Sequence, residues 1–125
     1  MATGTDARGL PSGYVFRPEY ELDAPEVKRL MSAARPALTL IDVRTHEELR
    51  VARVPGAEHV PLDELEAHLA SRESDGTPLV FMCHHGMRSM KAALLARAAG
   101  FAGAMSVAGG IDAWSLSADL TIPRY

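Results

Sequence analysis

The chain has 125 residues, a formal net charge of −3 at pH 7 and 47% hydrophobic residues. This length and composition are typical of one soluble globular domain with a single core. The charge argues against a general affinity for nucleic acid, and no apolar run approaches the ~20 residues that a membrane-spanning helix needs. The single cysteine, Cys83, excludes an internal disulfide. A lone thiol and the lack of an export signal favour a reducing, cytoplasmic location.

The first part of the chain, residues 1–18, is interrupted by glycine and proline and is predicted to be a flexible lead-in. One domain is expected over residues 19–125, with its ordered part starting near Tyr20. A short strand is expected at Glu21-Leu22. The sequence Asp23-Ala24-Pro25-Glu26 then predicts a helix start, with an aspartate N-cap, a proline in the first turn and a glutamate three residues after the cap.

The remaining strands and helices are expected to alternate along the chain. Strands are predicted at residues 37–41, 57–60, 79–82 and 104–107. Helices are predicted after the capping-box sequences that start at Thr45 and Asp63, over residues 90–99, and around residues 111–114. The tail from residue 119 is expected to be irregular. Alternating strands and helices predict an α/β domain whose mainly parallel sheet is flanked by helices on both faces.

The most informative stretch joins the strand at residues 79–82 to the helix that follows it. The strand ends at Cys83, and a polar loop with one glycine, Gly86, leads into the helix. The loop N–H groups and the helix N-terminus both favour an anion at this point, and Arg88 adds a positive charge. Gly86 suits the tight curvature or positive φ that such a loop needs. This pattern predicts a nucleophilic thiolate at Cys83 rather than a buried core cysteine.

The segment Cys83-His84-His85-Gly86-Met87-Arg88-Ser89 resembles the active-site loop of the rhodanese family of sulfurtransferases. Three other stretches resemble motifs of that family in the same order along the chain. They are Ile41-Asp42-Val43-Arg44, Val54-Pro55-Gly56-Ala57 and Gly109-Gly110-Ile111-Asp112-Ala113-Trp114. The resemblance covers residues 20–114 and implies a rhodanese-like three-layer domain. It departs from the family at Ala52-Arg53, where many members have Gly-His.

The resemblance implies a double-displacement mechanism. Cys83 would take the outer sulfur of a small anionic donor such as thiosulfate and carry it as a persulfide. Cyanide, a thiol or a sulfur-carrier protein would then remove that sulfur. Residues 84–89 would bind the substrate and the persulfide. Asp42 would brace the site, and Arg44 would form an ion pair rather than act in catalysis.

No cofactor, nucleic acid or membrane partner is expected, and no metal. Adjacent residues rarely reach one metal together, so His84, His85 and a single cysteine do not predict a zinc site. The last residues, Pro123-Arg124-Tyr125, resemble the tails of rhodanese modules attached to ubiquitin-activating-like sulfur-carrier enzymes.

Other functions of the same loop stay open. A phosphatase or arsenate reductase on this scaffold would place arginine sixth after the cysteine. Here Arg88 is the fifth residue after Cys83, and Ser89 is the sixth. The shorter loop favours a single sulfur atom over a tetrahedral oxyanion. A non-enzymatic interaction module would commonly lack the cysteine, and a persulfide relay with little turnover lies between that module and an enzyme.

Overall fold

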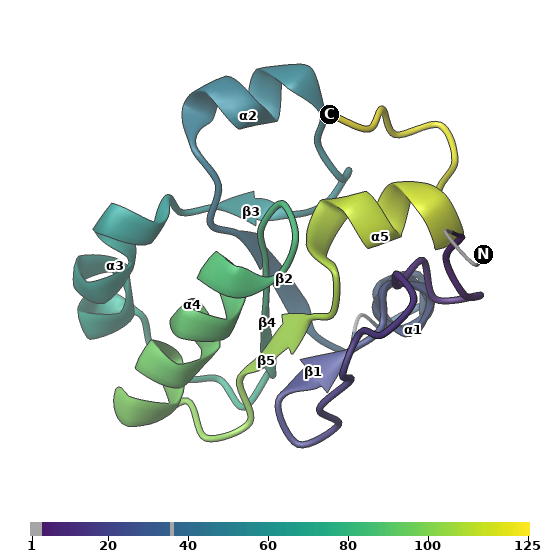
Figure 1. Cartoon of the computed structure of the whole chain (residues 1–125). Coiled ribbons are helices and arrows are strands. Elements are labelled where there is room, and N and C mark those ends of the chain that lie inside the picture. The colour runs from purple at the N-terminus through teal and green to yellow at the C-terminus, as the bar shows by residue number, and fades with distance from the viewer. Residues whose placement is uncertain (1–3, 36) are drawn as a thin grey trace.

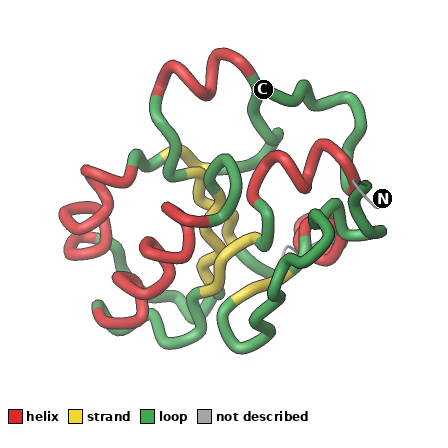
Figure 2. The backbone as a smooth tube through the Cα atoms, in the orientation of Figure 1, coloured by secondary structure: helices red, strands yellow, loops and turns green. Residues whose placement is uncertain are grey.

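The computed structural model describes residues 4–35 and 37–125, which form an α/β fold around one sheet (Figures 1 and 2). The strands are β1 (Glu21–Leu22), β2 (Thr39–Asp42), β3 (Glu58–His59), β4 (Leu79–Met82) and β5 (Met105–Val107). The helices are α1 (Ala24–Met31), α2 (His46–Val51), α3 (Leu65–Ser71), α4 (Met87–Ala98) and α5 (Gly110–Ser117), with a 3-10 turn, η1 (Leu62–Glu64), before α3. No helix in the described residues is both long enough and apolar enough to cross a bilayer.

The strand order is β1-β5-β4-β2-β3, and neighbouring strands in the sheet are parallel. Side chains of the central strands alternate between two apolar layers. Leu40 and Val80 pack with α1 and α5 around Trp114, whereas Ile41 and Phe81 pack with α3 and α4 on the other face. The sheet therefore lies between two helical layers (Figure 1), which confirms the predicted three-layer α/β domain.

Two of the predicted helix starts are confirmed by their capping bonds. The Asp23 side chain accepts a hydrogen bond of 2.9 Å from the backbone N–H of Glu26. Thr45 and Glu48 form both bonds of a capping box at the start of α2. The prediction that Asp63 caps the next helix is wrong. Asp63 lies inside η1, and the residue before α3 is Glu64, whose backbone is already helical and whose side chain makes no capping bond, because η1 runs directly into α3.

Helix α4 begins at Met87, three residues before the predicted start at Met90. The loop ends abruptly at Gly86, whose φ of 111° lies in the left-handed region, and the helical conformation follows at once. Arg88 and Ser89 therefore belong to the first turn of α4. Their backbone N–H groups are among those that a helix leaves without intrahelical partners.

The N-terminal segment packs on the domain earlier than expected. Residues 1–3 of the predicted lead-in lie outside the described residues. Leu10 is buried in a cluster with Ala108 and Ala113 of the β5–α5 region. The packed part of the chain therefore begins before Tyr20, because small side chains beside α5 leave room for an apolar residue of the preceding segment.

Candidate active site

Three strand ends lie next to one another at the carboxyl edge of the sheet. Cys83 follows β4, Asp42 ends β2, and Gly109 follows β5. Since β4 lies between β5 and β2, the thiol is placed between the other two strand ends. In parallel α/β sheets this edge is where ligands commonly bind.

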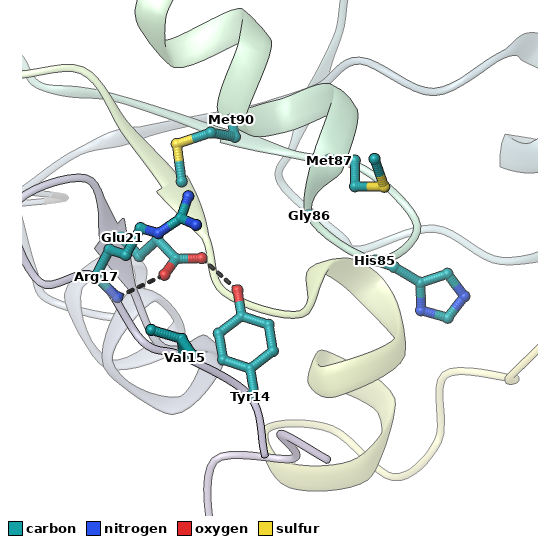
Figure 3. Close-up of a pocket in the computed structure, with 8 residues that line it drawn as sticks. All are labelled: Tyr14, Val15, Arg17, Glu21, His85, Gly86, Met87 and Met90. Carbon is teal, nitrogen blue, oxygen red and sulfur yellow. Dashed lines mark hydrogen bonds between the residues drawn. The ribbon is translucent and has the colours of Figure 1, made fainter. Parts of the chain in front are cut away.

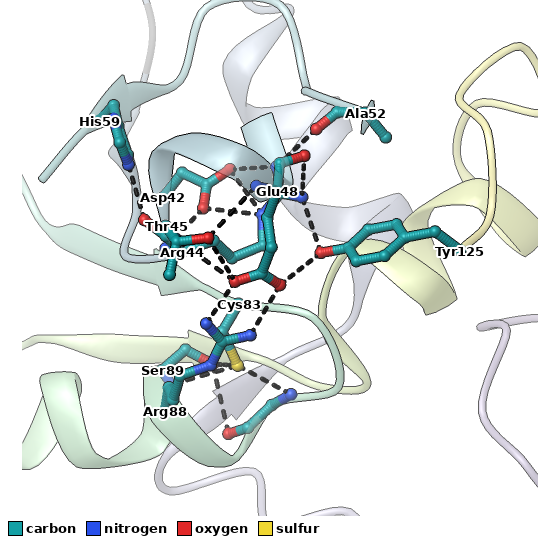
Figure 4. Close-up of polar contacts among 11 residues, drawn as sticks. Asp42, Arg44, Thr45, Glu48, Ala52, His59, Cys83, Arg88, Ser89 and Tyr125 are labelled. Carbon is teal, nitrogen blue, oxygen red and sulfur yellow. Dashed lines mark hydrogen bonds and ion pairs between the residues drawn. The ribbon is translucent and has the colours of Figure 1, made fainter. Parts of the chain in front are cut away.

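The sulfur of Cys83 is enclosed by its own loop (Figure 4). Its Sγ accepts hydrogen bonds from the backbone N–H of Gly86, at 3.0 Å, and of Ser89, at 3.3 Å. The thiol also lies 3.4 Å from the hydroxyl of Ser89, which bonds to the hydroxyl of Ser106 at 2.8 Å. Only 1% of Cys83 is exposed. Two N–H groups directed at one sulfur are placed to stabilise negative charge that develops on it.

The N-terminus of α5 donates hydrogen bonds to the backbone of the loop. The N–H of Ile111 donates to the carbonyl of Cys83 at 2.8 Å, and the N–H of Asp112 donates to the carbonyl of His84 at 3.1 Å. This approach is possible because residue 110 is glycine: a Cβ on Gly110 would lie 2.4 Å from the Cys83 oxygen. The Gly-Gly element near the end of the chain thus anchors the loop that carries the thiol.

The charge of Arg88 is paired with a carboxylate. Its Nη1 and Nη2 donate to Oε1 and Oε2 of Glu48 at 2.6 and 2.9 Å (Figure 4). These bonds raise the pKa of Arg88, with a further contribution from Cys83, and hold the pKa of Glu48 well below its usual range. Sequence reasoning identified Arg88 but missed Glu48, because the capping box already accounted for that glutamate locally.

Arg44 forms a buried ion pair, and its partner is Asp42. Nη2 of Arg44 lies 2.7 Å from Oδ2 of Asp42, and the two side chains are 0% and 2% exposed. The same Nη2 donates to the carbonyl of Ala52 at 2.8 Å. The pair ties the C-terminal end of α2 to the end of β2, and so supports the helix that carries Glu48.

The two loop histidines differ in their surroundings. His84 stacks on the ring of Tyr125, with centroids 3.9 Å apart and planes 4° apart, whereas His85 is exposed. Among the described residues, no group of three or more histidine, cysteine, aspartate or glutamate side chains is arranged to hold a metal ion. The sequence pattern places Tyr125 only in an irregular tail, and its contact with the loop is visible only in the structure.

Pockets flank the loop on two sides. One, of about 470 Å³, separates the loop from the N-terminal segment (Figure 3). Its lining comprises Tyr14, Val15, Arg17, Glu21, His85, Gly86, Met87 and Met90. The other, of about 460 Å³, has Arg44, Arg88 and Lys91 in its wall together with Asp63 and Glu66. His85 and Met87 lie at the edge of the first pocket and point away from Tyr14 and Glu21 (Figure 3), whereas Arg88 lines the other.

The chain matches the family model of the Rhodanese-like domain over residues 23–117. It is 33% identical over 103 residues to human "Thiosulfate:glutathione sulfurtransferase", in a match that covers 72% of this chain and 88% of that protein. It is 31% identical over 124 residues to "Adenylyltransferase and sulfurtransferase MOCS3-1" of Zea mays, covering 94% of this chain and 26% of that protein. The chain therefore spans about a quarter of the length of this maize relative.

The solved structure of the human single-domain sulfurtransferase TSTD1 superposes with a TM-score of 0.67 at 31% identity. That match covers 79% of this chain and 96% of the human one. The fold, the four motifs and the family match agree over the same residues, and the chain belongs to the rhodanese-like domain family of sulfurtransferases.

Proposed function

We propose that this chain transfers sulfane sulfur through a persulfide on Cys83, from a small anionic donor such as thiosulfate to a nucleophilic acceptor. The observation that supports this most directly is the pair of N–H donors, from Gly86 and Ser89, on the cysteine sulfur. They stabilise a thiolate before the reaction and are placed to stabilise negative charge on sulfur during it. The family relatives that carry sulfurtransferase names support the same reaction.

The first half-reaction is a displacement at sulfur. The Cys83 thiolate attacks the outer sulfur of thiosulfate and forms a new S–S bond. The bond between that sulfur and the sulfonate sulfur breaks, and sulfite leaves with the electron pair. In the second half-reaction a nucleophile attacks the outer sulfur of the persulfide, which releases the Cys83 thiolate. Covalent catalysis of this kind gives ping-pong kinetics.

The charges near the loop support an anionic donor. Arg88 and Lys91 line the pocket on the α2 side of the loop together with Asp63 and Glu66, so a small anion entering there meets Lys91 and the guanidinium end of the Arg88–Glu48 ion pair. On the other side, His85 and Met87 are exposed at the edge of the pocket beside the N-terminal segment, where an acceptor has room to approach. A cytoplasmic thiol or a sulfur-carrier protein fits this role.

A persulfide relay is a second candidate, and the burial of Cys83 favours it. Cys83 is only 1% exposed, so its sulfur reacts slowly with acceptors unless the surrounding loop or tail moves. A relay would form the persulfide readily and release it to cyanide or glutathione slowly. The rates of the two half-reactions therefore distinguish the relay from an enzyme with rapid turnover.

The proposal is tested by mass spectrometry of the intact chain after incubation with thiosulfate and removal of excess reagent. A gain of one sulfur atom, mapped to the peptide that contains Cys83, is expected together with released sulfite. Addition of cyanide or glutathione should then remove the added mass. Cys83→Ala should show no gain.

Sulfur transfer that survives in Cys83→Ala, or sulfite release without an adduct on Cys83, would refute the proposal. Turnover of p-nitrophenyl phosphate that vanadate inhibits would instead favour phosphatase chemistry. We expect none, because Arg88 is one residue too early for a phosphate loop and is paired with Glu48.

A further inference from the structure

The tail after α5 crosses to α2 and ends beside the active-site loop (Figure 1). Two contacts hold it on the way. Ile122 is buried in the apolar layer that contains Trp114. Nε of Arg124 lies 2.8 Å from Oδ1 of Asp112, a residue of α5. The position of Tyr125 is therefore set by the burial of Ile122 and by the ion pair of Arg124.

Tyr125 contacts the loop and the supporting charges at the same time. Its hydroxyl donates to Oε2 of Glu48 at 2.6 Å and accepts from Nη1 of Arg44 at 2.9 Å (Figure 4). Its ring stacks on His84, and its backbone oxygen lies 2.8 Å from Nε2 of that histidine. A phenol has one proton to donate, so this hydroxyl is used fully as both donor and acceptor.

These contacts complete the surroundings of Glu48. Its Oε1 accepts from Arg88 and, at 3.2 Å, from the backbone N–H of Thr45, while its Oε2 accepts from Arg88 and Tyr125. The carboxylate is thus held by its own helix on one oxygen and by the tail on the other. Without the phenol, Oε2 would keep only Arg88, and the ion pair could rotate about the remaining contacts.

We propose that Tyr125 is a positioning residue for chemistry at Cys83: it orients Arg88 through Glu48 and holds His84, the residue that follows the nucleophile. The proposal rests on the proposed function of Cys83, and it adds a requirement at a residue outside the four motifs. A displacement of catalytic groups by about 1 Å can reduce a rate by about 100-fold. We therefore expect Tyr125→Phe, which keeps the stack, to lower kcat/KM for thiosulfate roughly tenfold and Tyr125→Ala to lower it roughly 100-fold.

Alkylation of Cys83 separates positioning from a general structural role. Iodoacetate is anionic and iodoacetamide is neutral, and both modify the same sulfur. If Tyr125 orients Arg88, Tyr125→Phe lowers the ratio of the iodoacetate rate to the iodoacetamide rate. A loosened structure changes both rates in the same sense and leaves the ratio as in the wild type. The same measurement is valid even if thiosulfate is not a donor, so the two proposals can fail separately.

The matched control is Tyr20→Phe. Tyr20 lies on a different part of the domain, where the guanidinium carbon of Arg97 is 4.8 Å from the centroid of the tyrosine ring. It should leave the alkylation ratio and kcat/KM unchanged. Thermal unfolding of each variant shows whether the fold is retained. If Tyr125→Ala does not fold, Tyr125→Phe still tests the proposal.

A double-variant comparison tests the path through Glu48. If the hydroxyl of Tyr125 acts on Arg88 through that carboxylate, Tyr125→Phe should have little further effect on the ratio in a Glu48→Gln background. Independent, additive effects of the two changes would overturn the path. A ratio and a kcat/KM for Tyr125→Phe that equal those of Tyr20→Phe would overturn the proposal as a whole.

Discussion

Replacing Gly110 by alanine tests the contact that holds the active-site loop on α5. Gly110 has a φ of +62°, and a Cβ there would lie 2.4 Å from the carbonyl oxygen of Cys83 and 2.5 Å from that of His84. Cβ atoms essentially never approach other heavy atoms closer than 3.0 Å. Both obstructing atoms are backbone atoms, so the loop or α5 must move by at least the difference between 3.0 and 2.4 Å.

The cost has two parts. A residue with a side chain loses about 1–2 kcal/mol in the left-handed conformation. Excess volume in a packed site costs about 1–3 kcal/mol more. Gly76→Ala separates these parts, because Gly76 has a φ of +85° but a Cβ added there would meet nothing within 4 Å. We therefore expect Gly110→Ala to be less stable than Gly76→Ala by the packing cost alone, about 1–3 kcal/mol.

Urea denaturation of both variants gives this difference in the free energy of unfolding. The rate of Cys83 alkylation, measured on the folded proteins, reports the loop itself. Gly110→Ala should change this rate because the carbonyl of Cys83 is displaced, whereas Gly76→Ala should not. If both variants lose the same stability and both retain the wild-type alkylation rate, the contact with α5 does not position the loop.

Two further predictions concern the carboxylates of the two ion pairs, Asp42 and Glu48. Asp42→Asn leaves the guanidinium of Arg44 buried without its counter-ion and should lower the free energy of unfolding by about 3–5 kcal/mol, as measured by urea denaturation. Glu26→Gln, at the exposed pair with Arg29, should have a much smaller effect, and equal losses would contradict the assignment. Arg88 and then Tyr125 lower the pKa of Glu48, so its contribution to stability is complete above the unfolded pKa of about 4.3 and declines as the pH falls toward the lower folded value. Urea titrations below about pH 4.3 should show a weaker pH dependence for Glu48→Gln than for the exposed control Glu47→Gln, and identical slopes would refute this pKa assignment.

The elements that the sequence predicted well are those with a local physical signal. The strand at residues 79–82 is a short apolar run, and the starts of α1 and α2 carry side chains that cap their own helices. Gly86 could be assigned a positive φ because the chain must turn sharply between a strand and a helix. The parallel sheet followed from the alternation of strands and helices. Asp63 was misplaced because a 3-10 turn and a true N-cap present the same residue types.

The residues that the sequence did not reveal are joined by contacts between distant segments. Glu48 and Arg88 are separated by 40 positions, and Tyr125 lies 77 positions beyond Glu48. Leu10 likewise finds its apolar partners only once α5 is in place. In each case a satisfactory local interpretation existed: a capping residue, an irregular tail, a flexible lead-in. Tertiary contacts gave these residues further partners, and no periodicity in the sequence indicates such contacts.

The pairing of charges limits how strongly this site attracts an anion from a distance. Arg88 with Glu48 and Arg44 with Asp42 each sum to zero net charge, so their attraction for a donor falls off quickly with distance. Close to the sulfur, the effect of the Arg88–Glu48 pair on an anion depends on which of the two side chains is nearer. Cys83 contributes to the raised pKa of Arg88, so the two groups interact. Stabilisation of sulfur anions therefore depends on the two N–H donors and on the orientation of one ion pair. An orientation needs a second point of attachment, and in this chain the hydroxyl of Tyr125 provides it.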